Sequence, residues 1–190
     1  MTDYLSIDWT RYHTHAQSLA EKILSRPERF DEIVAIARGG LVIGRLLSDF
    51  LQLPISSITI QSYTDIQEQG EVKITAKLVT PIKNKRVLLV DDLTDSGKTL
   101  HRATEYLKEL QPASITTAVL YMKPKSTFRP DFFVEETDRW ILFPFEVTEW
   151  VTTFTKKMKG EGKSPEEINA FLLSLGYTKS QMNFTKKYFS

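Results

Sequence analysis

The segment Arg86–Leu100, RVLLVDDLTDSGKTL, constrains the fold of this chain more than any other part of the sequence. It begins with the wholly apolar run Val87–Val90, which is typical of a strand that is buried on both faces of a sheet. Two acids and a short polar turn follow, and the turn leads into Lys98–Leu110, whose amphipathic spacing predicts a helix. A buried strand joined to a helix by a short turn is the repeating unit of proteins with a parallel sheet.

The same order of strand, turn and helix appears nearer the N-terminus. The β-branched run Asp31–Ala37 ends at the turn Arg38-Gly39-Gly40, and the amphipathic stretch Leu41–Leu53 follows. We predict two further strands, at Ile55–Ile60 and at Ser114–Tyr121. Together these elements predict an α/β fold with a central, mostly parallel sheet that is flanked by helices. Ligands of such sheets bind beyond the carboxyl ends of the strands, so the two turns form the candidate site.

A pair of acids, Asp91 and Asp92, directly follows the buried run. Adjacent carboxylates repel each other unless a cation or several hydrogen-bond donors neutralise them, and their hard oxygen atoms suit Mg²⁺ or the hydroxyl groups of a sugar. Beyond them, small and polar residues surround the predicted start of a helix, where backbone amides and hydroxyl groups favour a phosphate group. One turn therefore offers both a metal or diol site and a phosphate site.

The sequence of this turn allows two other interpretations. Gly97-Lys98-Thr99 could end a P-loop, but that motif needs a glycine five residues before Gly97, where this chain has Asp92. The acids could instead only cap a helix, since Asp and Ser are favoured at helix starts. Helix capping explains a single Asp or Ser at this place. It does not explain two acids, a further acid and a small, glycine-containing turn in succession.

The string VLLVDDLTDSGKT resembles the motif by which type I phosphoribosyltransferases bind phosphoribosyl pyrophosphate. The resemblance implies the fold of that family, with a small hood. It implies that Asp91 and Asp92 contact the ribose hydroxyls or Mg²⁺, with Asp92 as a metal ligand, and that Asp95 acts near the purine N7 as general acid or base. The implied phosphoribosyl pyrophosphate site also includes the residues that follow the acids: Leu93, Thr94, Asp95, Ser96, Gly97, Lys98 and Thr99.

Ala37-Arg38-Gly39-Gly40 resembles the pyrophosphate loop of the same family. Glycines allow the backbone to approach a ligand closely, and an arginine side chain can pair with two phosphate oxygens at once. In the family, the peptide bond that enters this loop is often cis, so the Ala37–Arg38 bond is a candidate. Arg38 is expected to bind the pyrophosphate and to assist its departure, while Gly39 and Gly40 complete the binding site.

Residues further along resemble the base-binding residues of bacterial xanthine-guanine phosphoribosyltransferases. The ammonium group of Lys123 would donate a hydrogen bond to the purine O6, and it would reject the amino group of adenine. Trp140 would stack on the purine ring, next to main-chain groups of Ile141, and Glu146 would assist metal binding. A solvated lysine and a tryptophan that only packs in the core are the competing explanations.

The segment Ser62–Thr80 alternates polar and apolar residues around Gly70, a pattern typical of an exposed hairpin. Ser62-Tyr63 resembles the start of the family's flexible catalytic loop, which closes over the reaction and excludes water. Tyr63 is therefore expected to join Arg38 and Asp95 in catalysis. The alternative is an ordinary exposed hairpin.

Composition excludes several other classes of protein. Lys and Arg number 25 against 24 for Asp and Glu, so the net charge is +1 and gives no general reason to expect nucleic-acid binding. Without cysteine, the chain has no disulfide, thiolate nucleophile or cysteine-ligated zinc. No apolar run approaches the ~20 residues that span a bilayer, and the N-terminus lacks a signal-peptide pattern. We therefore expect a cytoplasmic protein that binds neither membranes nor nucleic acid.

The C-terminal part of the chain differs in character. Thr155–Lys163, TKKMKGEGK, is basic and contains glycine, which predicts a linker. Ser164-Pro165-Glu166-Glu167 has a capping-box pattern with proline at the first helical position, and Gly176 ends the apolar helix that contains FLLSL. We expect a phosphoribosyltransferase domain at 1–154, hood included, and a small helical extension at 155–190. The apolar face of that extension would pack on the hood, on another subunit or on a partner.

The resemblance covers roughly Asp31–Glu149 and implies an enzyme of purine salvage. It implies transfer of the 5-phosphoribosyl group from phosphoribosyl pyrophosphate to guanine, xanthine or hypoxanthine, with Mg²⁺ as cofactor. The products would be the nucleoside monophosphate and pyrophosphate, and the assembly a homo-oligomer, either dimer or tetramer. Two alternatives stay open: a regulator on the same fold that senses phosphoribosyl pyrophosphate or a nucleotide, and a phosphoribosyltransferase for another base.

Overall fold

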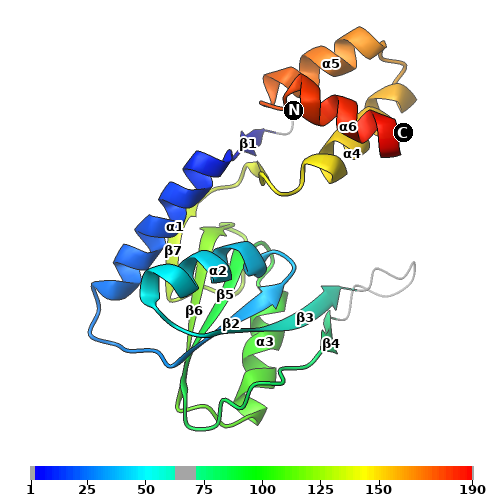
Figure 1. Ribbon diagram of the computed structural model, residues 1–190. Helices are drawn as coiled ribbons and strands as arrows, with labels where there is room; N and C mark the ends of the chain where they lie inside the picture. Colours follow the sequence, from blue (N-terminus) through cyan, green and yellow to red (C-terminus); the bar gives the residue numbers. More distant parts are fainter. Residues whose placement is uncertain (1–2, 63–71, 190) are drawn as a thin grey trace. The chain divides into compact units, whose positions relative to one another are not determined.

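The computed structural model describes residues 3–62 and 72–189, and it divides into two compact units (Figure 1). The sheet unit comprises His13–Asp138. The hood unit comprises Met1–Tyr12 together with Arg139–Ser190. The division falls within the first helix, α1 (Trp9–Leu24).

The sheet unit contains a six-stranded sheet in the order β4-β3-β2-β5-β6-β7. All neighbouring strands are parallel except β3 and β4, which form an antiparallel pair. The predicted α/β fold with a mostly parallel sheet is therefore confirmed. The strands span these residues: β2 (Glu32–Ala37), β3 (Ile55–Ser62), β4 (Val72–Ala76), β5 (Arg86–Thr94), β6 (Ser114–Met122) and β7 (Phe132–Glu136).

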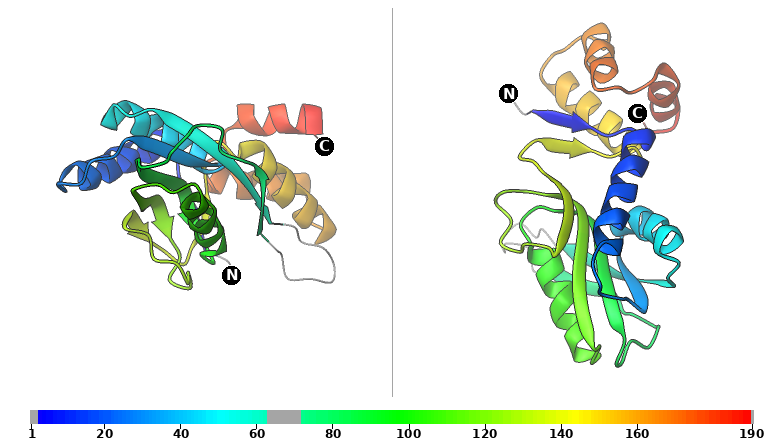
Figure 2. Two further views of the ribbon diagram at one scale, coloured as in Figure 1. Left: turned by 90° about the horizontal axis from the view of Figure 1, so that it is seen from below. Right: turned by 90° about the vertical axis from the view of Figure 1, so that its left-hand side faces the viewer.

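The two faces of this sheet are covered by different helices (Figure 2). Val34 and Ile36 of β2 belong to a buried cluster that includes Leu100 and Leu107 of helix α3 (Lys98–Glu109). Side chains alternate along a strand, so Ala35 points to the opposite face. There helix α2 (Gly40–Leu51) approaches closely, because a Cβ added at Gly44 would lie 2.9 Å from the Ala35 Cβ.

The order of the strands fixes where a ligand can bind. β2 and β5 are neighbours, but α2 leads from β2 to β3 on one side, while α3 leads from β5 to β6 on the other. The two connections diverge, and in sheets of this kind ligands bind at such a point, beyond the carboxyl ends of the strands, here β2 and β5. Both turns singled out in the sequence lie at this edge of the sheet.

The hood unit has its own secondary structure and core. Strand β1 (Tyr4–Ser6) pairs in parallel with β8 (Trp140–Leu142). Three helices follow β8: α4 (Val147–Gly160), α5 (Pro165–Ser174) and α6 (Lys179–Phe189). They pack around a cluster of buried side chains: Leu142, Val151, Phe154, Ile168, Leu172, Tyr177 and Met182.

The predicted linker at Thr155–Lys163 is wrong for most of its length, because α4 continues through it to Gly160. Val151, Phe154 and Met158 recur on one face of that helix and pack on the hood core, which stabilises the helix despite its basic composition. The boundary expected between 154 and 155 therefore lies inside α4. By contrast, α5 begins as predicted: Ser164 caps it with a complete capping box, and a proline follows.

The apolar helix α5 packs within the hood unit. Leu172 is fully buried among the core side chains, while the neighbouring Leu173 is 44% exposed. Leu172→Ala is therefore expected to lower the free energy of unfolding by about 2–5 kcal/mol, measured by chemical denaturation followed by circular dichroism. Leu173→Ala is the matched control and should change it by less than ~1 kcal/mol. Equal effects at both positions, or an effect that depends on protein concentration, would contradict this packing.

Within the described residues, the structure has no helix that is both long enough and apolar enough to cross a membrane.

Candidate active site

The two turns at the carboxyl ends of β2 and β5 touch each other directly. A Cβ added at Gly39 would lie 2.5 Å from Oδ1 of Asp92 and 2.6 Å from Oδ2. At Gly40 an added Cβ would lie 2.5 Å from the carbonyl oxygen of Val90. Both distances are far below ordinary contact, so only glycine allows the loop to pack against the strand that carries the acids.

The acids lie at the end of a longer strand than the sequence predicts. β5 continues through Asp91 and Asp92 to Thr94, because Asp91 and Leu93 pair in register with β6. Pairing with a neighbouring strand outweighs the weak β-propensity of aspartate. Both carboxylates thereby become fixed on the sheet rather than on a mobile turn.

Asp91 and Asp92 are both buried, with exposed fractions of 7% and 9%. Burial raises the pKa of Asp91, and the neighbouring charge of Asp92 raises it further. The amides of Asp92 and Gly40 act in the opposite direction by donating hydrogen bonds to the Asp91 carboxylate, the first at an N to Oδ1 distance of 3.0 Å. A cation or a pair of sugar hydroxyls at this position would favour the charged form of both acids.

The phosphate loop, residues 95–99, leads from β5 into α3. Gly97 precedes the helix with a φ of 87°, a left-handed conformation that favours glycine. The amide of Lys98 donates to Oγ of Ser96 at 3.4 Å, which tightens the turn. The first amides of a helix have no partner within the helix, so the N-terminus of α3 and the side chain of Thr99 suit an anion such as a phosphate.

A second loop, residues 123–128, supports the phosphate loop, and of its residues only Lys123 is predicted from the sequence as a site residue. Thr127 donates from its amide (3.1 Å) and from its hydroxyl (2.9 Å) to the carbonyl of Ser96. Ser126 and Thr94 share a hydrogen bond of 3.0 Å between their hydroxyl groups. Local sequence carries no signal for this support, because it depends on β6 lying beside β5 in parallel, which brings the polar residues after β6 to the same edge of the sheet.

Lys123 begins this second loop and is buried, with 7% of its surface exposed. Burial lowers its pKa, and the negative charge of nearby Asp95 partly offsets that effect. Asp95 itself is exposed and forms an ion pair with Lys125 at 3.0 Å. The structure thus brings a buried ammonium group and an accessible carboxylate together beside the phosphate loop.

Arg38 lies at the carboxyl end of β2, and the peptide bond between Ala37 and Arg38 is cis, as the resemblance suggests. Its side chain is exposed. Tyr63, the third predicted catalytic residue, lies outside the described residues.

A family model, the phosphoribosyl transferase domain, matches residues 8–150. The chain belongs to the phosphoribosyltransferase family. The match ends near the start of α4, so most of the three-helix segment of the hood unit lies beyond it.

Relatives of this phosphoribosyltransferase agree with that assignment. The xanthine-guanine phosphoribosyltransferase of Gluconobacter oxydans is 33% identical over 147 residues, which cover 75% of this chain and 84% of the relative. A crystal structure of a purine phosphoribosyltransferase from Pyrococcus horikoshii is 36% identical with a TM-score of 0.70, covering 75% of this chain and 94% of the other. A protein of Neisseria gonorrhoeae with bound ppGpp is 28% identical with a TM-score of 0.71, covering 77% and 90%.

The other predicted base-binding residues of this phosphoribosyltransferase lie in the hood unit, on β8. Ile141 is buried, whereas the Trp140 ring is 51% exposed. The Trp140 ring meets the Trp150 ring edge-on, with centroids 5.7 Å apart and an interplanar angle of 84°. Such a contact fixes the orientation of the Trp140 ring while half of its surface stays accessible.

Glu146 has a structural partner in the hood unit. Its Oε2 accepts a hydrogen bond of 3.0 Å from the indole nitrogen of Trp150. Trp150 therefore links the other two residues: it donates a hydrogen bond to Glu146, and its ring packs against the ring of Trp140. The metal-binding role that the resemblance implies for Glu146 stays a prediction.

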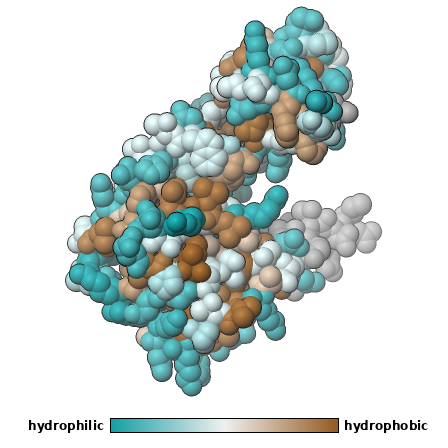
Figure 3. All heavy atoms as spheres, viewed as in Figure 1, coloured by the Kyte–Doolittle hydropathy of each residue, from teal (hydrophilic) through white to brown (hydrophobic). Residues whose placement is uncertain are grey.

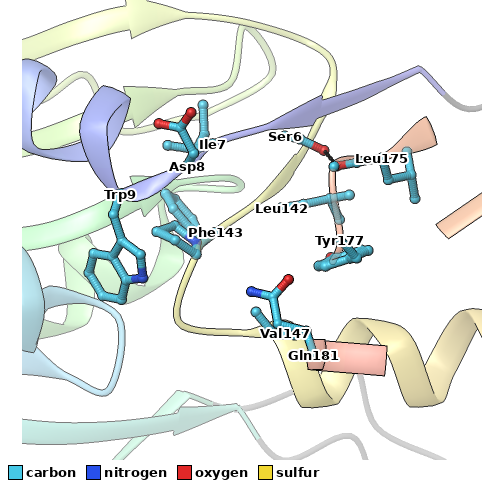
Figure 4. A pocket seen from close by; sticks show the side chains of 12 residues that line it. Ser6, Ile7, Asp8, Trp9, Leu142, Phe143, Val147, Leu175, Tyr177 and Gln181 are labelled. Carbon is cyan, nitrogen blue, oxygen red and sulfur yellow. Dashed lines mark hydrogen bonds between the residues drawn. The ribbon is translucent and has the colours of Figure 1, made fainter. Parts of the chain in front are cut away.

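A pocket of about 250 Å³ lies within the hood unit of the phosphoribosyltransferase (Figure 4). Phe143, Tyr177 and Gln181 are among its lining residues, and the hydroxyl of Ser6 closes one side by donating to the carbonyl of Leu175 at 2.6 Å. The Tyr177 hydroxyl is buried without a hydrogen-bond partner among the described residues. Burial raises its pKa, and the negative charge of Glu146 adds to the effect.

The histidines form no part of the candidate site. Nδ1 of His15 shares a hydrogen bond of 2.9 Å with the buried Tyr121 hydroxyl, and His101 lies 3.6 Å from Glu105 on the surface of α3. No group of three or more His, Asp or Glu side chains that could hold a metal ion occurs in residues 3–62 and 72–189.

Proposed function

We propose that this phosphoribosyltransferase transfers the 5-phosphoribosyl group from phosphoribosyl pyrophosphate to a 6-oxopurine, which would be guanine, xanthine or hypoxanthine. One observation carries the proposal. At the point where the strand order reverses, the loop 38–40, the acid pair and the phosphate loop meet, with the buried Lys123 beside Asp95. The xanthine-guanine relative adds support for the class of base.

The acid pair and the phosphate loop provide the binding site for the donor. Asp91 and Asp92 would accept hydrogen bonds from the ribose hydroxyls, and the turn from Asp95 to Thr99 would surround the 5′-phosphate. The buried oxygen ligands of the acids fit Mg²⁺, with Asp92 and, on the resemblance, Glu146 as the ligands. Mg²⁺ would neutralise charge on the pyrophosphate.

Bond cleavage between ribose C1 and pyrophosphate leaves positive charge on the ribose and negative charge on the leaving group. Arg38 and the amides of Gly39 and Gly40 would stabilise the leaving pyrophosphate. Asp95, accessible at the start of the phosphate loop, would exchange a proton at the purine N7. Tyr63 would belong to the segment that excludes water from the reaction.

On the resemblance to xanthine-guanine phosphoribosyltransferases, one polar and one aromatic side chain would recognise the base. Lys123 would donate to the O6 atom of the purine, which adenine lacks, and its burial makes that hydrogen bond selective. Trp140 would stack on the base, and the main chain at Ile141 would contact its edge. We include a homo-oligomeric assembly in this proposal on the resemblance alone.

A direct assay tests the proposal. The protein is incubated with Mg²⁺, phosphoribosyl pyrophosphate and a panel of bases, and the release of pyrophosphate is followed. We expect turnover with at least one 6-oxopurine and none with adenine or pyrimidines. Binding of the donor without turnover on any base would instead favour a regulator that senses phosphoribosyl pyrophosphate or a nucleotide, an alternative that the ppGpp-bound relative makes concrete.

Lys123→Met tests the assignment of the base site, because methionine keeps the length of the side chain and removes its charge. Loss of a hydrogen bond from a charged donor is expected to lower kcat/KM for the preferred oxopurine by about 10–100-fold. The effect should appear mainly in KM for the base, while KM for the donor stays near the wild-type value. Lys108→Met, at an exposed position on α3, is the matched control. Unchanged selectivity against adenine would remove Lys123 from the base site.

A further inference from the structure

The phosphate loop, residues 95–99, contains one peptide group that is held at one end only. The carbonyl of Ser96 accepts two hydrogen bonds from Thr127, one from its amide at 3.1 Å and one from its hydroxyl at 2.9 Å. The amide of Gly97, at the other end of the same peptide group, has no hydrogen-bond partner among the described residues. An unpaired amide at the start of a helix suits an anion such as a phosphate group.

The geometry of the peptide group links these two ends. Within residues 3–62 and 72–189 the only cis peptide bond is Ala37–Arg38, so the bond between Ser96 and Gly97 is trans. In a planar trans peptide the carbonyl and the amide point in opposite directions. Because the Ser96 carbonyl points toward Thr127, the Gly97 amide points away from the second loop, residues 123–128. Thr127 therefore sets the direction in which this amide can donate.

The second loop is itself anchored on both sides of Thr127. Phe128 packs against the buried core cluster of the sheet unit. The Ser126 hydroxyl shares a hydrogen bond of 3.0 Å with the hydroxyl of Thr94, which is only 2% exposed. The loop also contacts Gly97 directly, because a Cβ added there would lie 2.6 Å from the amide nitrogen of Phe128. The donors of Thr127 thus have a fixed place beside the end of β5.

The hydroxyl of Thr127 is not needed to satisfy a buried group. Thr127 and Ser96 are both exposed, so a water molecule can take the place of this hydroxyl. An exposed hydrogen bond that is exchanged for one with water changes stability little. A mobile water molecule, however, does not hold the Ser96 carbonyl in one direction. Orientation of the peptide group therefore explains two donors on one carbonyl better than stability does.

We propose that Thr127 is a positioning residue for the 5′-phosphate of the donor. It acts through Ser96: it holds the Ser96 carbonyl and so keeps the amide of Gly97 directed at the phosphate, whose charge strengthens the hydrogen bond from that amide. The loop that begins with Lys123, the proposed base-binding residue, thus also shapes the phosphate site. This inference rests on the proposed donor site, and it does not depend on which base the enzyme uses.

Thr127→Val tests the proposal, because valine keeps the shape of the side chain and removes only the hydroxyl. We expect the affinity for phosphoribosyl pyrophosphate to fall by about tenfold, since a misdirected amide weakens one charge-assisted hydrogen bond. Calorimetric titration in the presence of Mg²⁺ measures this loss. Ribose 5-phosphate, which keeps the 5′-phosphate and lacks the pyrophosphate, should be weakened by a similar factor. Unchanged affinity for the donor overturns the proposal, and so does a loss that ribose 5-phosphate does not share.

Steady-state kinetics separate positioning of the phosphate from general damage to the active site. The 5′-phosphate takes no part in the bond changes, so its contacts are the same before and during the reaction. KM for the donor should therefore rise by about tenfold, while kcat and KM for the base stay within about threefold of the wild-type values. Thr127→Ser keeps the hydroxyl and should restore most of the donor affinity. A fall in kcat with a rise in both KM values, or no rescue by serine, counts against the proposal.

Thr153→Val is the matched control. Its side chain is exposed on α4 of the hood unit, where the surface mixes hydrophilic and hydrophobic residues (Figure 3), so a methyl group in place of a hydroxyl should be tolerated. We expect wild-type donor affinity and melting temperature in this variant. Thr127→Val should also keep the wild-type melting temperature to within about 2 °C. A larger fall in the melting temperature of Thr127→Val would assign Thr127 to the fold and contradict the positioning role.

The titrations need no turnover, so this inference and the proposed function can fail separately. A wild-type protein that binds the donor but converts no base would contradict the proposed function, while the comparison of donor affinities would still decide the role of Thr127. Equal donor affinity of the wild type and of Thr127→Val would contradict that role even in an enzyme that uses a 6-oxopurine.

Discussion

Asp95→Ala is expected to lower kcat by about 10²–10⁴-fold, the range typical of a general acid or base. Asp95 is exposed at the start of the phosphate loop and lies near the buried Lys123, where a purine N7 could reach it. Removal of the carboxylate should impair the chemical step far more than binding of the sugar phosphate. KM for phosphoribosyl pyrophosphate is therefore expected to stay within a few-fold of the wild-type value, measured by steady-state kinetics with pyrophosphate detection.

Glu105→Ala is the control for this experiment, since Glu105 is an exposed acid on the helix that begins at Lys98. Its removal should leave both kcat and KM nearly unchanged. Near-normal turnover of Asp95→Ala would exclude Asp95 from the mechanism. A change confined to KM for the donor would assign Asp95 to phosphate binding.

Gly39→Ala should lower kcat/KM for the donor by about 10²-fold, a loss typical of a shift of about 1 Å in an active site. The backbone at Gly39 has a φ of −54°, which alanine adopts without strain. Any loss of activity would therefore come from the close approach of residue 39 to Asp92 and not from backbone strain. An added Cβ would lie 2.5 Å from Oδ1 of Asp92, so the carboxylate would have to move. Steady-state kinetics together with calorimetric titration of the donor would measure both consequences.

Gly160→Ala provides the matched glycine control. A Cβ added at Gly160, in the last turn of α4, would meet no atom within 4 Å. This variant should keep full activity and gain up to ~1 kcal/mol of stability, since alanine favours a helix over glycine. Wild-type affinity of Gly39→Ala for the donor would mean that the Asp92 carboxylate can shift without loss and is not a fixed part of the donor site.

Much of the sheet unit could be predicted from local sequence. Val87–Val90 predicts a buried strand because every residue is apolar. The acids and small polar residues that follow it indicate a metal or sugar site and a phosphate site without any knowledge of the fold. The contact between Gly39 and Asp92 could not be predicted in this way, because it depends on β2 lying beside β5. The same holds for the support that Ser126 and Thr127 give to the phosphate loop.

The hood unit was harder to predict. β1 is a strand of three residues that pairs with β8, far away in the sequence, and no periodicity can be detected over so short a run. The composition of the basic end of α4, in which lysine and glycine dominate, predicts a linker. The helical spacing of Val151, Phe154 and Met158 was the better guide, since burial of one face decides whether a segment is helical.

The division of the chain into two units has a consequence for its optical properties. The chain has three tryptophans, Trp9, Trp140 and Trp150, and all of them belong to the hood unit. Indole emission therefore reports on that unit alone, whereas the sheet unit contributes strongly to the far-ultraviolet dichroism. A thermal scan recorded with both signals can thus reveal whether the two units melt together or in sequence, without any attached dye.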